Sequence, residues 1–148
     1  MKQVKLAFGA DHGGYGLKAK LIEAARHAGH DIIDCGTNDA ASVDYPDFAA
    51  AVCRAIIAGE ADLGVLVCGT GIGMSIAANR YKQIRCGLCT DTTAARLTRA
   101  HNDANVLALG ARLIGEEVAL DILHHFLTTP YEGGRHDRRI AKLTGQTA

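Results

Sequence analysis

Residues 65–75 read VLVCGTGIGMS, an apolar run that stops at Cys68 and gives way to alternating glycines. This pattern predicts a strand, a tight loop and the start of a helix. Closely spaced glycines let the backbone turn sharply and approach a ligand, and the first turn of a helix offers unpaired N–H groups to an anion. A thiol beside such groups is favoured as the thiolate, so Cys68 is a candidate base or nucleophile.

The glycine loop differs from two familiar phosphate-binding sequences. No Lys-Ser or Lys-Thr pair follows it, as a Walker A loop requires. The third glycine of Gly69-Thr70-Gly71-Ile72-Gly73 also comes too early for the dinucleotide fingerprint. The loop alone therefore indicates a phosphate or oxyanion site, with a plain strand-to-helix turn around a buried cysteine as the alternative.

The composition is typical of a single domain. A chain of 148 residues buries roughly 68–70% of the surface that its unfolded form exposes. Its 16 basic residues balance its 16 acidic ones, which argues against a nucleic-acid or membrane partner. The N-terminus opens into a strand pattern without a signal-peptide core, and no apolar run could span a bilayer, so we expect a cytoplasmic protein.

The five cysteines are expected to be reduced, because an odd number without an export signal does not indicate a disulfide framework. Cys86 and Cys89 form a C-x-x-C pair inside a predicted strand, where a separation of three places the side chains on opposite faces. A redox pair prefers a helix N-terminus, and a zinc site of this type needs a second pair. We therefore predict no metal site here.

Strand-like and helix-like segments alternate along the chain. Strands are predicted at 4–10, 31–34, 63–67, 85–88 and 105–109. Helices are predicted from about Leu17 to Ala28, at about 47–58, through Ile76 to Asn79, at about 92–100, and around an apolar stripe of Val118, Ile122, Leu123 and Phe126. Five strands alternating with five helices predict a three-layer α/β/α, doubly wound, Rossmann-like fold with a five-stranded parallel sheet. We expect one domain over 1–148, with a C-terminal helical tail from about 131.

Ligands of doubly wound folds bind beyond the carboxyl ends of the strands. Three informative loops follow the first, third and fifth predicted strands: Asp11-His12, 68–73 and Gly110-Ala111-Arg112. His101 and Asn102 precede the fifth strand and are predicted at the opposite edge. A site that combines them with Cys68 would therefore need a second chain.

The tail combines a glycine turn with a basic helical segment. Arg135 and Arg139 stand four residues apart, hence on one helix face. Two guanidiniums at this spacing suit a phosphate group, which they can grip in bidentate fashion. A solvated basic terminus is the alternative.

Short motifs follow one another along nearly the whole chain: Asp11-His12-Gly13-Gly14, Asp44-Tyr45-Pro46, Cys68-Gly69-Thr70-Gly71-Ile72-Gly73, Ser75-Ile76-Ala77-Ala78-Asn79, His101-Asn102-Asp103, Asn105-Val106-Leu107 and Tyr131-Glu132-Gly133-Gly134-Arg135-His136. In order and spacing they resemble the type B ribose-5-phosphate isomerases. That wider family also includes galactose-6-phosphate isomerase subunits and isomerases of other short sugar phosphates.

The resemblance implies that the chain interconverts ribose 5-phosphate and ribulose 5-phosphate through a cis-enediolate, without a metal or an organic cofactor. By position, Cys68 is implied as the base that moves a proton between C2 and C1, and His101 as the group that assists opening of the furanose ring. Thr70 is counted with them as catalytic. The backbone of residues 69–73 is implied to donate hydrogen bonds to the developing oxyanion.

The resemblance also implies which residues bind the substrate. Asp11 and His12 would contact the sugar hydroxyls and ring oxygen, and Asn102 would hold the oxygens near the carbonyl. Tyr45 is either a wall of the sugar pocket or an aromatic that packs a turn. The phosphate would be bound by Arg112, Arg135 and Arg139. Family members are dimers or dimers of dimers in which His101, Asn102 and Arg112 are similar to residues of the neighbouring subunit.

One branch of this family has a glutamate at the position of Met74 and lacks the cysteine, so this sequence resembles the cysteine-base branch. Three other substrates stay open: allose 6-phosphate, galactose 6-phosphate and erythrulose 4-phosphate. A non-catalytic sugar-phosphate-binding module is a further alternative, but the presence of both Cys68 and His101 favours an enzyme. The remaining histidines at 27, 30, 124 and 125 are predicted at the surface or an interface, and His136 has no assignment.

Overall fold

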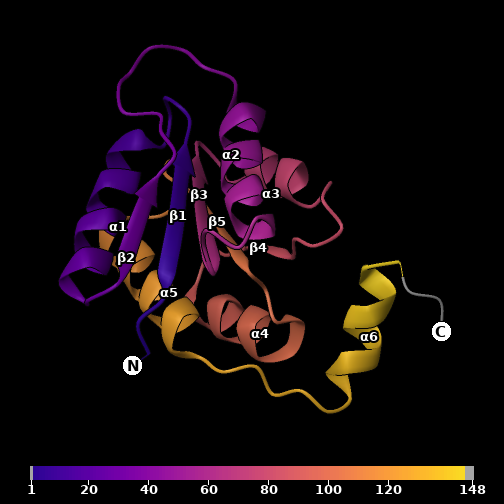
Figure 1. Ribbon diagram of the computed structural model, residues 1–148. Helices are drawn as coiled ribbons and strands as arrows, with labels where there is room; N and C mark the ends of the chain where they lie inside the picture. The colour runs from indigo at the N-terminus through magenta and orange to yellow at the C-terminus, as the bar shows by residue number, and fades with distance from the viewer. Residues whose placement is uncertain (1, 146–148) are drawn as a thin grey trace.

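A computed structural model describes residues 2–145 and contains one parallel sheet in the order β2-β1-β3-β5-β4 (Figure 1). Its strands are β1 (Lys5–Ala10), β2 (Asp31–Asp34), β3 (Leu63–Cys68), β4 (Cys86–Leu88) and β5 (Val106–Gly110). The chain runs from β1 outward to β2, and then crosses to β3 on the other side of β1. The order therefore reverses between β1 and β3, where ligands of such folds bind.

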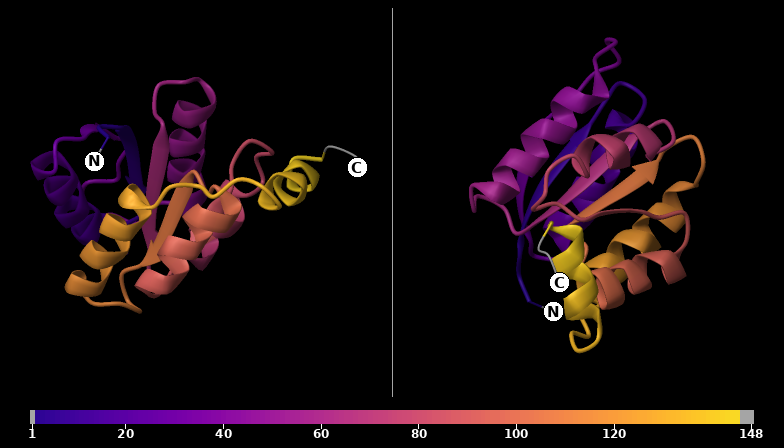
Figure 2. Two further views of the ribbon diagram at one scale, coloured as in Figure 1. Left: turned by 90° about the horizontal axis from the view of Figure 1, so that it is seen from below. Right: turned by 90° about the vertical axis from the view of Figure 1, so that its right-hand side faces the viewer.

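Helices cover both faces of the sheet (Figures 1 and 2). The first face carries α2 (Tyr45–Ile57) and α3 (Ile72–Ala78). The second carries α1 (Tyr15–His27), α4 (Thr92–Asn102) and α5 (Glu116–Thr128). The predicted three-layer doubly wound fold is thereby confirmed, with element ends within a few residues of those expected.

Burial separates the central strands from the edge strands. All five residues of β5 are buried, and β1 and β3 are buried except at their first residue. The edge strands β2 and β4 contain no buried residue. Long apolar runs are typical of strands covered on both faces, and burying each large apolar side chain contributes about 1.5–3 kcal/mol. The three strands that position the loops described below therefore form the most buried part of the molecule.

The last helix, α6 (His136–Leu143), packs mainly against α4 and projects beyond the three layers (Figure 2). It occupies part of the predicted helical tail, whose residues 146–148 lie outside the described range. Between residues 2 and 145, no helix has the length and apolar character that a membrane span requires.

Cys86 and Cys89 pack against different core clusters, on opposite faces of the sheet. The predicted geometry of this pair is confirmed.

Two predictions about burial are wrong. His30 was expected at the surface or an interface, but it is buried in the turn between α1 and β2 of its own chain, where its Nδ1 accepts the Val4 N–H at 3.1 Å. Val118 was expected on the buried stripe of α5, but it is 41% exposed and Ala119 is buried instead. The spacing explains this, because residues 119, 122, 123 and 126 follow the helical repeat and position 118 lies to one side.

Candidate active site

The loops after β1, β3 and β5 meet at the carboxyl edge of the sheet, as predicted. The Asp11 N–H donates to the Val67 carbonyl at 3.3 Å. On the other side, the Ala111 N–H donates to the Cys68 carbonyl and the Arg112 N–H to the Gly69 carbonyl, both at 2.9 Å. Since β1, β3 and β5 are neighbours in the sheet, their loops form one continuous surface.

Glycines allow these loops to approach so closely. A Cβ on Gly14 would lie 2.3 Å from the Val67 carbonyl oxygen, and one on Gly110 would lie 2.5 Å from that of Thr70. Gly71 has a φ of +77°, and a Cβ there would meet the Leu109 backbone at 2.8 Å. Residues with side chains would push the loops apart at all three positions.

Cys68 is the last residue of β3 and is almost fully buried. Its Sγ accepts a hydrogen bond from the Gly71 N–H at 3.1 Å. The N–H groups of Gly69 and Thr70 make no hydrogen bond within residues 2–145, whereas the Thr70 hydroxyl accepts the Ile72 N–H at 3.2 Å. The sulfur therefore lies beside backbone donors that are free to bind a ligand.

The other four cysteines are in environments that keep them protonated. Burial raises the pKa of Cys53 to about 11 and the pKa of Cys89 to about 12. Burial likewise raises the pKa of Cys35 and of Cys86. The sulfurs of Cys53 and Cys89 face backbone carbonyls, at 4.0 and 3.8 Å, to which a thiol can donate. Cys68 differs because its sulfur is the acceptor.

Polar side chains surround the loop that follows Cys68. Asp11 is buried, and its Oδ1 accepts the Gly13 N–H at 2.9 Å. The exposed His12 accepts the Val43 N–H on Nδ1 at 3.2 Å, so Nε2 carries the proton in the neutral ring. The Tyr45 ring lies against Gly73, where a Cβ would come within 2.7 Å of it. These contacts bring Asp11, Tyr45 and the glycine loop together.

Arg112 belongs to this edge in its own chain. Its Nε would lie 3.5 Å from a Cβ on Gly69, and its N–H bonds the Gly69 carbonyl. The sheet order explains this position, since β5 lies directly beside β3 and carries Arg112 to the loop, as the strand-end rule predicted. The role of this arginine at a neighbouring subunit's site, which the resemblance implied, stays a prediction.

The remaining predicted site residues lie elsewhere. His101 and Asn102 end α4, Arg135 precedes α6, and Arg139 lies within it. Cys68 pairs with Gly110, the last residue of β5, whereas His101 comes before Val106, the first residue of β5. The four residue steps of β5 alone separate the two groups by roughly 13 Å. Within one chain, the structure does not bring His101, Asn102 or the two arginines to Cys68.

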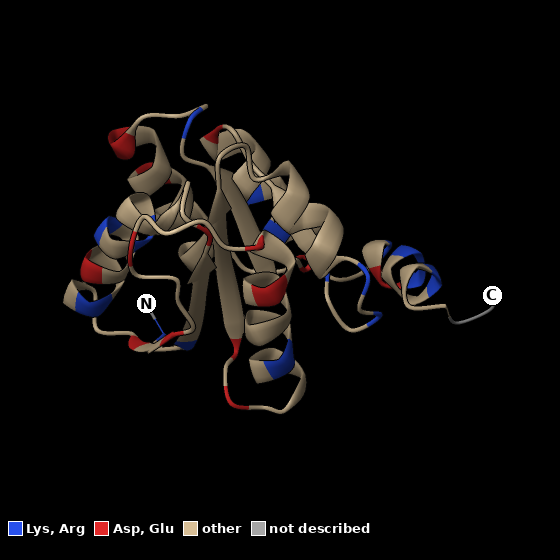
Figure 3. Ribbon diagram, turned by 90° about the horizontal axis from the view of Figure 1, so that it is seen from above, with Lys and Arg blue, Asp and Glu red and all other residues tan. Residues whose placement is uncertain are grey.

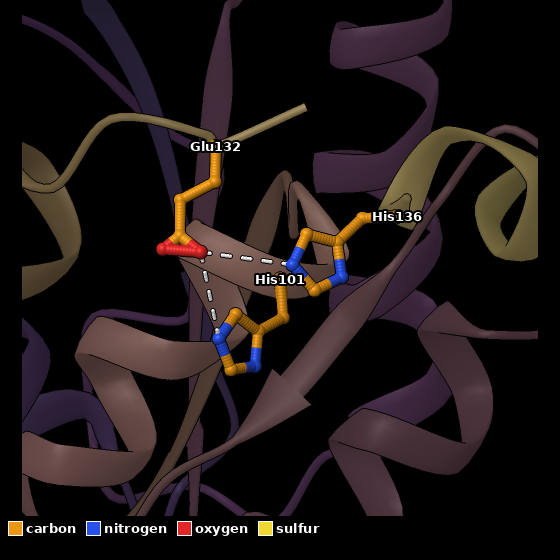
Figure 4. A group of neighbouring side chains, drawn as sticks. All are labelled: His101, Glu132 and His136. Atoms are coloured by element: carbon orange, nitrogen blue, oxygen red, sulfur yellow. Dashed lines mark ion pairs between the residues drawn. The ribbon is translucent and has the colours of Figure 1, made fainter. Parts of the chain in front are cut away.

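His101 instead meets two residues of the segment after α5 (Figure 4). The Oε1 of Glu132 lies 3.7 Å from Nε2 of His101 and 3.6 Å from Nε2 of His136. The two imidazole rings are stacked, with centroids 4.6 Å apart and an interplanar angle of 17°. Neither Glu132 nor His136 was predicted to be a site residue. They stand four residues apart, but Glu132 precedes α6, so helical spacing alone does not predict their contact.

These three side chains are of the types that bind zinc. A metal must lie in the plane of each imidazole that binds it, along the nitrogen lone pair. In stacked rings 17° from parallel, the lone pairs do not converge on one point. The observed geometry therefore favours a carboxylate shared by two imidazoles, and a metal would require one ring to turn.

A cavity of about 390 Å³ lies near this second group rather than at Cys68. It is bordered by Asn102, by Leu143 of α6 and by a basic segment that includes Arg80, Lys82 and Arg85. Further basic residues lie on α6, so positive charge gathers around this part of the molecule (Figure 3).

Comparison with known proteins relates this fold and these loops to one family. A family model described as Ribose/Galactose Isomerase matches residues 6–143. The chain belongs to the ribose/galactose isomerase family. Within this family, ribose-5-phosphate isomerase B of Escherichia coli is 45% identical over 140 residues, which cover 95% of this chain and 94% of that protein.

Solved structures of the ribose/galactose isomerase family have the same fold. That of a ribose 5-phosphate isomerase from Thermotoga maritima has a TM-score of 0.95 and 50% identity, and the match covers 97% of this chain and 99% of that one. Ribose-5-phosphate isomerase B of Clostridium thermocellum has a TM-score of 0.94 and 47% identity, covering 95% of each chain. The family expected from the short motifs is thereby confirmed.

Proposed function

We propose that this chain interconverts ribose 5-phosphate and ribulose 5-phosphate, with Cys68 as the base. The observation that carries the proposal is the placement of Cys68 Sγ, which accepts the Gly71 N–H inside a glycine loop at the ligand-binding edge of the sheet. The relatives named for this activity match the chain over nearly its whole length.

The proton transfer needs one base and a set of donors. The Cys68 thiolate removes the proton from C2 of the open aldose, which leaves a cis-enediolate. The proton of the C2 hydroxyl then passes to the adjacent C1 oxygen, and the Cys68 thiol returns its proton to C1 to give the ketose. Negative charge develops on the carbonyl oxygen during the first step. The free N–H groups of Gly69 and Thr70 can stabilise that charge, and donors of this kind each contribute about 2.7–4 kcal/mol in the transition state.

Ring opening needs a second acid–base group. As the bond between C1 and the ring oxygen breaks, His101 gives a proton to the ring oxygen, and the C1 hydroxyl returns a proton to the imidazole. Both His101 and Cys68 must then come within about 3 Å of one small substrate. Because they are roughly 13 Å apart or more in one chain, we propose that His101 and Asn102 reach the site from a second copy, in a homodimer or a dimer of dimers.

The surface beside the glycine loop suits such a partner. Ile72 and Ile76 on α3 are 48% and 55% exposed, and Leu88 nearby is 38% exposed. Apolar side chains gathered at a surface are typical of an interface. The basic helix α6 projects beyond its own layers (Figure 2). From there Arg135 and Arg139 can reach a neighbour's substrate phosphate, next to the neighbour's Arg112.

The proposal is tested by following ribose 5-phosphate and ribulose 5-phosphate with the purified protein, with EDTA present throughout. Turnover in both directions is the expected result. Turnover only of a six-carbon or four-carbon sugar phosphate would change the substrate and keep the reaction. Binding of these sugar phosphates without turnover of any would overturn the enzyme in favour of a binding module.

A further inference from the structure

The carboxylate of Glu132 lies between the two stacked histidines, and the chemistry proposed above leaves it unused. We propose that Glu132 is a positioning residue for His101, which it holds in the orientation that ring opening requires. This inference rests on the proposed function and adds a residue to it.

The backbone holds Glu132 beside His101. The Glu132 N–H donates to the Ala100 carbonyl at 3.0 Å, which ties the segment after α5 to the residue that directly precedes His101. The Glu132 side chain is 53% exposed, so it is anchored through its main chain and not by burial. Its Oε1 then lies on the Nε2 side of His101 (Figure 4).

A carboxylate at this position orients the imidazole. Its Oε1 lies 3.7 Å from Nε2 of His101, so it favours the ring position in which the protonated Nε2 faces the carboxylate. Nδ1 makes no hydrogen bond within the described part of the chain, so it is the nitrogen left for the substrate.

The other charged groups near the end of α4 are occupied with one another. Asp103 pairs with Arg99 at 2.9 Å and with Arg85 at 3.4 Å. His136 is buried, and its ring stacks on that of His101 and limits how His101 can turn. Glu132 is therefore the carboxylate available to His101 in this chain.

Assays with ribulose 5-phosphate and with ribose 5-phosphate distinguish a role of Glu132 in ring opening from a general effect on structure. Ribulose 5-phosphate has no furanose form, because the hydroxyl that would close the ring carries the phosphate. Exchange of its C1 hydrogen with deuterated water therefore reports enediolate formation alone. Net conversion of ribose 5-phosphate reports ring opening as well, since this aldose is mainly a furanose.

The experiment compares Glu132→Gln with wild type in both assays. We expect conversion of ribose 5-phosphate to fall by about 10–100-fold, part of the factor that acid–base groups contribute. Exchange at C1 of ribulose 5-phosphate should stay within about twofold. Glu117→Gln, at an exposed position in the first turn of α5, is the matched control and should leave both rates unchanged.

Equal losses in the two assays would show that Glu132 acts on the whole site, and no loss in either would show that His101 does not need it. Both results would overturn the inference. A wild-type protein without either activity would instead overturn the proposed function, and the two failures are thus distinguishable.

Discussion

The two edges of the sheet are built in different ways. At the carboxyl edge, backbone groups meet through glycines, and the loop after Cys68 is held by bonds such as that from the Arg112 N–H to the Gly69 carbonyl. At the amino edge, side chains meet, with Glu132 between His101 and His136. Three neighbouring strands hold the first group, whereas a segment that crosses from α5 to α6 holds the second.

Under the proposed function, this difference divides the catalytic work between the two edges. The carboxyl edge offers fixed main-chain donors, which suit an oxyanion whose position does not change. The amino edge offers groups that gain and lose protons. The following predictions test whether the two edges do separate work and whether they come together only between chains.

The largest expected effect is at the carboxyl edge. Replacing Cys68 by alanine should lower turnover of ribose 5-phosphate by about 10²–10⁴-fold, the usual contribution of an acid–base group. Met74, in the first turn of α3, is buried and has no proton-accepting group that could substitute. Cys53→Ala is the control, because Cys53 is buried in the same core cluster, and it should retain full activity. Turnover that survives in Cys68→Ala would remove this thiol from the mechanism.

Mixing variants from the two edges should restore activity. Cys68→Ala and His101→Asn should each be nearly inactive alone. If the two edges meet between chains, each mixed dimer has one intact site and one site that lacks both groups. Mixed dimers make up about half of the dimers refolded from an equal mixture, so about one quarter of wild-type activity should return. Turnover is measured before and after joint refolding. A mixture as inactive as its components would place both groups in a site within one chain.

The phosphate arginines should show a smaller effect. Arg139→Ala should raise KM for ribose 5-phosphate by about tenfold or more, because a hydrogen bond to a charged group contributes about 1.5–3 kcal/mol. Arg138→Ala, at the adjacent and exposed position of α6, removes the same charge from a different face and should have little effect. Steady-state kinetics of the two variants give the comparison, and equal changes would mean that net charge alone matters.

The smallest effect concerns the thiols that face carbonyls. Burial raises the pKa of Cys53 from its ordinary value of 9.0 to about 11. Between these values the unfolded chain loses the Cys53 proton while the folded chain keeps it. The contribution of this thiol to the free energy of unfolding is therefore complete below pH 9 and falls as the pH rises toward 11. Urea unfolding on both sides of this window should show a shallower fall in Cys53→Ala. An unchanged slope would mean that this thiol does not contribute.

Much of the carboxyl edge could be predicted from local patterns. Alternating apolar and glycine-rich segments predicted each strand and helix, and the rule that parallel strands end at one edge placed Asp11, Cys68 and Arg112 together. These predictions work because a glycine turn and an apolar strand depend on neighbours close in the chain.

The burial of Val118 was predicted wrongly from a local pattern, the helical repeat of α5. The other error and the omissions concern contacts between residues distant in the chain. The burial of His30 depends on its bond to Val4, 26 residues away.

Local residue patterns thus account for the elements, the glycine loop and the separation of Cys68 from His101. The tertiary structure alone accounts for the strand order, for the burial of His30, and for Glu132 between two histidines. The physical reason is that backbone sterics and apolar periodicity act over a few residues. The meeting of residues 101, 132 and 136 depends instead on how a long segment docks against α4, which is decided by the packing of the whole chain.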